Sequence, residues 1–223
     1  KFYLFASQFT KGKQVADIGC GSGYGCRILK QSGAAFLYGA DASLASIKFA
    51  KARFGKYAHY SVQTITDIKD CKNQTFDVTV SSEVLEHIKE YNEEEIAIGQ
   101  LKRITKPKGL IIIGTPNSEM LSDHGFSYSE IYKLMKKNFS SFVIFENALV
   151  PFNKAKNIWL KRLSKGKTGV IVSEKINLKE TLLPSGVTVQ IKQGLKPGKY
   201  KLGPYTINTR SLHNTHSWVI IAV

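Results

Sequence analysis

Short apolar runs alternate with other segments of helical character along the first two thirds of the chain. Apolar runs of strand length lie at residues 13–18, 36–40, 59–65, 76–82, 110–116 and 142–150. Segments that read as helices lie between them, at 23–32, 43–54, 93–105 and 127–139. Strands that alternate with helices predict an α/β domain with a parallel sheet and right-handed crossovers.

The pattern changes after about residue 151. Residues 158–165 (IWLKRLSK) read as a short basic helix, and from residue 168 apolar and polar residues alternate between Gly and Pro, as in hairpins. WVIIAV at the end reads as a buried strand. We therefore predict three parts: a core over 1–150, a basic β-rich insertion or cap over 151–215, and a final core strand over 216–223.

Composition limits the class of protein. No apolar run approaches the roughly 20 residues that span a membrane. The cysteines are Cys20, Cys26 and Cys71, an odd number without a CxxC pair, so we expect no disulfide framework, no metal site and a cytoplasmic location. The net charge is +15, but only five of the 32 basic residues are arginine. This excess is typical of a solvated lysine-rich surface, and nucleic acid remains an alternative partner.

A glycine-rich segment follows the first predicted strand. It reads DIGCGSG from Asp17 to Gly23. The dinucleotide fingerprint G-x-G-x-x-G would need its third glycine at Tyr24 or Cys26, depending on where the motif is started. An acid at Asp17 would also repel a pyrophosphate and would suit a cation. These features disfavour an NAD-dependent dehydrogenase.

A second acid, Asp41, closes the second predicted strand, where a carboxylate can accept hydrogen bonds from a ribose diol. The ligand indicated by the two acids is a nucleoside that carries a cationic amino acid and no phosphate. S-adenosylmethionine (SAM) fits this description.

Four sequence blocks resemble one family. DIGCGSG at 17–23, YGADAS at 38–43, FDVTVSSEVLEHI at 76–88 and LKRITKPKGLIIIGTPN at 101–117 are similar to motifs of the class I SAM-dependent methyltransferases, in the family's order. The resemblance implies a Rossmann-like, seven-stranded, mostly parallel sheet with helices on both faces and with SAM at the carboxyl ends of strands one to four. The cofactor-binding residues it implies, together with the acids above, are Asp17, Gly19, Cys20, Gly21, Gly23, Asp41, Ala42, Ile65, Asp67 and Ser82.

One position departs from the family pattern. Many members carry an acid after the third strand that accepts the adenine amino group, whereas Thr64 or Ile65 stands there in this chain. We expect Asp67, or backbone groups near Ile65, to take that role.

Three residues are candidates for catalysis of methyl transfer. Glu83 follows the fourth strand, and His87 lies one helical turn beyond it. His124 precedes the helix at 127–139, where a histidine is common in the most similar members of the family. A histidine packed against the sheet is the alternative for His87. Glu86 is expected to be a structural hydrogen-bonder or a solvated helix residue rather than a catalyst.

The predicted function is transfer of a methyl group from SAM to an oxygen or nitrogen atom of a small molecule or glycan. Two alternatives remain. One is an RNA-directed methyltransferase that uses the basic C-terminal region, and the other is a SAM-binding module without catalysis. Tyr3 and Phe5, which precede the first strand, either cover the cofactor or belong to the core.

Overall fold

The computed structural model describes residues 2–118, 124–148, 169–171, 182–183, 187–188, 199–202, 205–208 and 215–223. The chain forms two compact units. The first comprises residues 1–115 and 221–223, and the second comprises residues 116–220.

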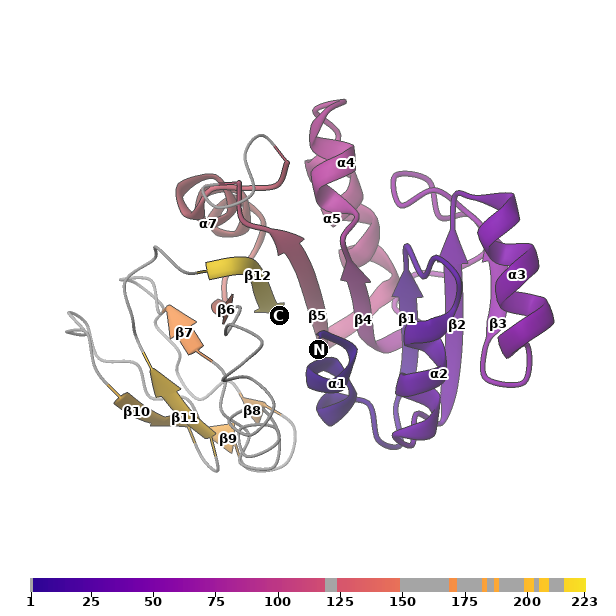
Figure 1. Cartoon of the computed structure of the whole chain (residues 1–223), viewed down its shortest axis with the longest axis horizontal. Coiled ribbons are helices and arrows are strands. Elements are labelled where there is room, and N and C mark those ends of the chain that lie inside the picture. Colours follow the sequence, from indigo (N-terminus) through magenta and orange to yellow (C-terminus); the bar gives the residue numbers. More distant parts are fainter. Residues whose placement is uncertain are drawn as a thin grey trace, which may run out of the picture. The chain divides into compact units, whose positions relative to one another are not determined.

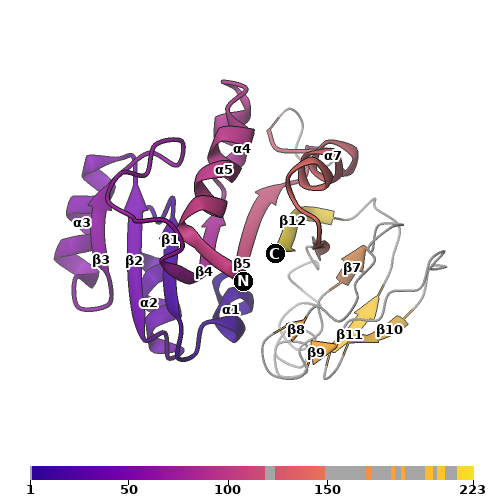
Figure 2. The ribbon, with the colours of Figure 1, turned by 180° about the vertical axis from the view of Figure 1, so that it is seen from behind.

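Five strands form the sheet of the first unit. They are β1 (Gln14–Ile18), β2 (Phe36–Asp41), β3 (His59–Val62), β4 (Phe76–Ser82) and β5 (Thr105–Pro116), in the order β3-β2-β1-β4-β5. Every pair among them is parallel. Figures 1 and 2 show these strands side by side from both faces. Because all run the same way, their carboxyl ends meet at one edge of the sheet.

Helices connect and flank these strands. They are α1 (Phe2–Ala6), the 3-10 turn η1 (Ser7–Phe9), α2 (Tyr24–Gln31), α3 (Leu44–Phe54), α4 (Leu85–Lys89) and α5 (Glu94–Ile104). Right-handed crossovers place α2 and α3 on one face of the sheet and α5 on the other, because the strand order runs outward from β1 in opposite directions. Ile98, Leu101 and Ile104 are buried on α5, as their spacing predicts.

The second unit contains α7 (Tyr128–Asn138), β6 (Phe142–Ala148), β7 (Gly169–Ile171), β8 (Leu182–Leu183), β9 (Val187–Thr188), β10 (Lys199–Leu202) and β11 (Tyr205–Asn208). Strand β12 (Thr215–Ala222) begins in this unit and ends in the first. The neighbours β12, β6 and β7 follow one another in the strand order. The indole of Trp218 is fully buried and donates to the Phe126 carbonyl at 2.8 Å.

The predicted α/β Rossmann-like class is confirmed, and the helix caps match their sequence signals. Ser43 accepts from the Ser46 amide at the start of α3, and Ser127 forms a capping box with Glu130 at the start of α7. Strand β3 ends at Val62 rather than at residue 65, because the chain turns at the Thr64–Asp67 bridge.

The sequence patterns missed one helix, and two predictions are not tested by the structure. Helix α1 was not predicted, since its five residues are too short for a periodic signal. The basic helix predicted at 158–165 lies outside the described residues, and the division of the chain near residue 151 stays a prediction.

Candidate cofactor site

The glycine loop between β1 and α2 is held against the end of β2. The amides of Gly19 and Cys20 both donate to the Ala40 carbonyl, at 2.7 and 2.9 Å. Gly19, Gly21 and Gly23 all have positive φ, at 80°, 51° and 78°. Side chains strain this left-handed conformation, so the alternating glycines are a requirement of the loop's shape.

Gly19 also lies against the segment that follows β4. A Cβ atom at Gly19 would come within 2.1 Å of the Cγ2 atom of Val84. The backbone of the loop after β1 therefore packs directly against the Val84 side chain after β4, and Gly19 has no side chain that would separate them. This close approach leaves bare backbone at the edge where a ligand of the parallel sheet is expected.

Asp41 connects the two loops that a ribose would face. One of its carboxylate oxygens accepts from the Gly21 amide at 2.8 Å, and the other accepts from the Ser43 amide at 2.9 Å. Its side chain is half-buried, and the neighbouring Ala42 is exposed. Each carboxylate oxygen has a second lone pair, so Asp41 retains acceptor capacity for hydroxyl groups.

Asp17 lies beneath the loop and not on its surface. It is fully buried, and its carboxylate accepts from the Tyr3 hydroxyl at 3.3 Å and from the Cys26 thiol at 3.4 Å. Burial raises the pKa of Asp17 to about 7, partly offset by these two hydrogen bonds. A hydrogen bond with Cys20, followed by burial, holds the pKa of the Cys26 thiol well above its usual value. Cys26 is therefore a neutral donor to Asp17.

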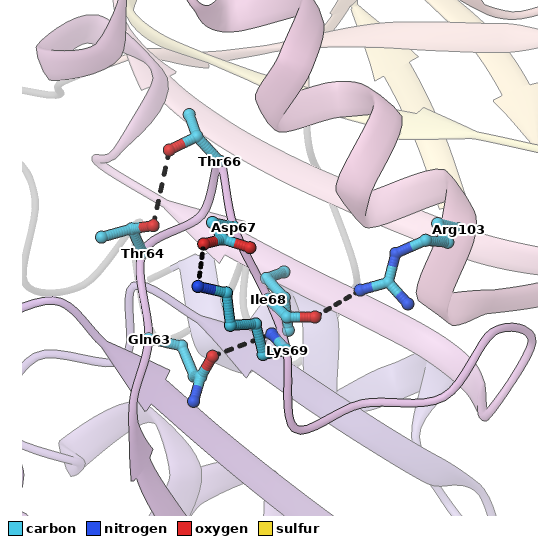
Figure 3. A network of polar contacts seen from close by, with 7 residues as sticks. All are labelled: Gln63, Thr64, Thr66, Asp67, Ile68, Lys69 and Arg103. Carbon is cyan, nitrogen blue, oxygen red and sulfur yellow. Dashed lines mark hydrogen bonds and ion pairs between the residues drawn. The ribbon is translucent and has the colours of Figure 1, made fainter.

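The segment after β3 supplies the residues predicted at the adenine end. Ile65 is 5% exposed, whereas Asp67 is exposed and pairs with Lys69 at 2.8 Å (Figure 3). Because Ile65 is buried and Asp67 is exposed, backbone groups near Ile65 are the better candidates for contact with the adenine than the Asp67 side chain.

Arg103 of α5 braces the same segment through hydrogen bonds. Its guanidinium donates to the Ile68 carbonyl (Figure 3). It also donates to the Cys71 carbonyl at 2.8 Å and to the side chain of Asn73 at 2.9 Å. A planar fork with several donors suits this set of acceptors, and a lysine could not reproduce it.

The carboxyl end of β4 places two of the predicted catalytic residues. Glu83 directly follows Ser82, has a positive φ of 56°, and its amide donates to the Gly114 carbonyl of β5 at 2.8 Å. This left-handed conformation is uncommon for glutamate, and such conformations are enriched at functional sites. His87 lies on the exposed face of α4.

Two other residues considered in the sequence belong to different units. Glu86 is 2% exposed, and its carboxylate accepts from the Thr115 hydroxyl at 2.9 Å, so the structural alternative is confirmed and the solvated one is wrong. His124 belongs to the second unit, in the loop before α7, and remains a candidate from that unit alone.

Residues that the sequence patterns did not assign also contribute to the site. Val84 and Arg103 carried no signal, because an apolar residue and a terminal helix arginine are both common without function. Tyr3 was left open between a cofactor role and a core role, and its hydroxyl touches Asp17.

A family model described as "Methyltransferase domain" matches residues 16–113, a range that holds the glycine loop, Asp41 and the end of β4. The chain contains a SAM-dependent methyltransferase domain. The predicted cofactor, SAM, is confirmed with it.

The curated relatives match the same half of the chain. The ubiquinone biosynthesis O-methyltransferase of Mesorhizobium japonicum is 32% identical over 115 residues, which cover 50% of this chain and 44% of the relative. The namesake from Haemophilus ducreyi is 31% identical over 113 residues, covering 48% and 46%. The chain thus spans less than half the length of these relatives.

Solved structures agree on the fold. A SAM-dependent methyltransferase from Thermotoga maritima, described as a possible histamine N-methyltransferase, has a TM-score of 0.61 at 16% identity and covers 100% of this chain and 87% of its own. The described residues contain no helix that is both long and apolar enough to cross a membrane.

Proposed function

We propose that this methyltransferase domain transfers the methyl group of SAM to an oxygen atom of a small molecule. The observation that carries the proposal is the meeting of the glycine loop, Asp41 and the β4 end at one edge of the sheet, with Gly19 in contact with Val84. The names of the curated relatives support an oxygen acceptor. A nitrogen atom or a glycan hydroxyl is the closest alternative acceptor.

The residues at the carboxyl edge of the sheet divide into those proposed to bind the ribose and the methionine end of SAM and those proposed to lie near the transferred methyl group. Asp41, which the Gly21 amide holds in place, accepts hydrogen bonds from the ribose, and the buried charge of Asp17 attracts the ammonium group of the methionine end. Ser82 and Glu83 border the methionine end of the cofactor or the acceptor. When bound, SAM supplies an electrophilic methyl group, whose bond to sulfur breaks as the bond to the acceptor forms.

Alignment of donor and acceptor supplies most of the rate in such a displacement. A hydroxyl acceptor must also lose its proton, and a nearby base assists that loss. Glu83 and His87 are the candidate bases in the first unit, and His124 is the candidate in the second.

The test is formation of S-adenosylhomocysteine from SAM with separate pools of phenols, amines, sugars and RNA. We expect turnover with phenols or other small hydroxyl compounds, at a rate that changes little up to about 300 mM salt. RNA binding, which rests on the +15 charge alone, would weaken steeply over that range. Turnover only with RNA would contradict the proposal, and absence of turnover with every pool would favour a SAM-binding module.

A further inference from the structure

Helix α1 is docked on the cofactor side of the sheet by two consecutive aromatic residues. The ring of Tyr3 covers Gly25 at the start of α2, where a Cβ atom would lie 2.1 Å from the ring. The ring of Phe2 covers Gly114 of β5, where a Cβ atom would lie 2.7 Å from it. Two glycines on different elements therefore make room for two neighbouring side chains of one short helix.

The Tyr3 hydroxyl forms a hydrogen bond with Asp17. It donates to one carboxylate oxygen at 3.3 Å, while the Cys26 thiol donates to the other at 3.4 Å. Asp17 has 0% exposed surface, so water cannot replace these donors. Loss of one would leave a buried carboxylate with a single partner, which favours the neutral acid.

We propose that Tyr3 is a positioning residue for the cofactor, which orients the Asp17 carboxylate and keeps it charged beneath the loop that receives the ammonium group of SAM. The inference rests on the proposed role of Asp17 in attracting that group. A buried charge acts over several ångströms at low dielectric, so Asp17 need not touch the ligand.

The surroundings of Asp17 determine the pH range in which its carboxylate changes charge. Its pKa is raised to about 7, first by burial and then by the charge of Asp41, whereas the hydrogen bonds from Cys26 and Tyr3 lower it. The ionisable groups that interact with Asp17 come from four elements of the first unit: Tyr3 on α1, Cys26 on α2, Asp41 on β2 and Tyr60 on β3. Cys20 in the loop interacts with Cys26.

Since the charged carboxylate is the form that attracts a cation, SAM binding should tighten as pH rises through about 7 and level off above it. The change Tyr3→Phe keeps the ring on Gly25 and removes only the donor, so the pKa of Asp17 rises and the binding midpoint moves to higher pH. We expect the SAM dissociation constant to increase about 3- to 10-fold at about pH 7 and to match the unchanged protein at about pH 9.

The experiment is a calorimetric titration of the full chain with SAM at several pH values, in two buffers that differ in ionisation enthalpy. Near pH 7 the unchanged protein should release about half a proton on binding, and Tyr3→Phe should release more. The matched control is Tyr91→Phe, the same chemical change at a side chain that is 71% exposed. It should leave both the affinity and the proton release as they are.

Three outcomes would overturn the inference. Equal pH profiles for Tyr3→Phe and the unchanged protein would mean that Tyr3 only anchors α1. An affinity loss of the same size at every pH would mean that the hydroxyl acts on the ligand without Asp17. SAM binding by the unchanged protein without any proton release near pH 7 would remove the link to Asp17, while leaving the proposed methyl transfer intact.

Discussion

At the residue scale, the cofactor site depends on a few backbone positions and on one buried acid. Gly19 combines a φ of 80° with a contact that leaves no space for a methyl group. Asp17 lies in the interior, where its charge costs free energy of folding. The proposed attraction of SAM requires the charged carboxylate, whereas stability favours the neutral acid.

The first prediction concerns Gly19→Ala. A side chain there is strained by the left-handed backbone and collides with Val84, so we expect a loss of about 1–3 kcal/mol in the free energy of unfolding and at least a tenfold loss of SAM affinity. Urea unfolding and calorimetry measure the two effects.

Gly99→Ala is the matched control for this change. Gly99 lies inside α5, and no atom is within 4 Å of a Cβ built on it. Alanine there should raise stability by about 0.5–1 kcal/mol and leave SAM affinity unchanged. An equal effect of the two changes would contradict the role assigned to the loop geometry.

The second prediction concerns Asp17→Asn, an isosteric change. The pKa of Asp17 is raised from 3.8 to about 7 in the folded chain, so between these values the folded state binds more protons than the unfolded state. The stability of the unchanged protein therefore falls as pH rises through this window, whereas the amide carries no such cost.

We expect the stability of Asp17→Asn relative to the unchanged protein to increase by up to about 3 kcal/mol from pH 5 to pH 8. SAM affinity at pH 8 should decrease in the same variant. Urea unfolding across this pH range measures the first effect. Stability curves that run parallel would show that the Asp17 carboxylate carries no folding cost.

At the element scale, the sequence identified most helices and strands of the first unit, because buried strands and capped helices carry local signals. Ser43 and the apolar stripe of α5 are examples in which pattern and structure agree. Helix α1 was not predicted because its five residues are too few for a periodic signal and its position depends on long-range contacts, such as that of Phe2 with Gly114 of β5. The bracing of the segment after β3 by Arg103 is a tertiary arrangement of the same kind.

The third prediction concerns this brace. Arg103→Lys keeps the positive charge but loses the fork that reaches the carbonyls of Ile68 and Cys71, so the segment 63–75 should open more often. We expect faster amide hydrogen exchange in that segment, a stability loss of about 1–3 kcal/mol and a weaker affinity for S-adenosylhomocysteine.

Arg53→Lys provides the control for Arg103→Lys, because Arg53 is exposed on α3. It should change neither the exchange of residues 63–75 nor the affinity. Unchanged exchange in Arg103→Lys would mean that the segment keeps its conformation without the brace.

At the scale of the whole molecule, the family motifs identified the domain and its cofactor, while the acceptor stays a proposal. Motif residues converge on the cofactor because every member binds the same molecule. Residues that bind the acceptor differ among members, so no sequence motif identifies them. The matched relatives also align with only about half of the chain. The +15 charge adds a general attraction to anions but specifies no site.

The central claim is that the edge formed by the glycine loop, Asp41 and the β4 end binds SAM. Calorimetric titration with SAM, S-adenosylhomocysteine and NAD tests it most directly, with Asp41→Ala as the site variant. We predict saturable one-to-one binding of both sulfur compounds by the unchanged protein, at least a tenfold loss in Asp41→Ala from the missing ribose acceptor, and no binding of NAD. Binding of NAD in place of SAM, or SAM binding that Asp41→Ala leaves unchanged, would contradict the account.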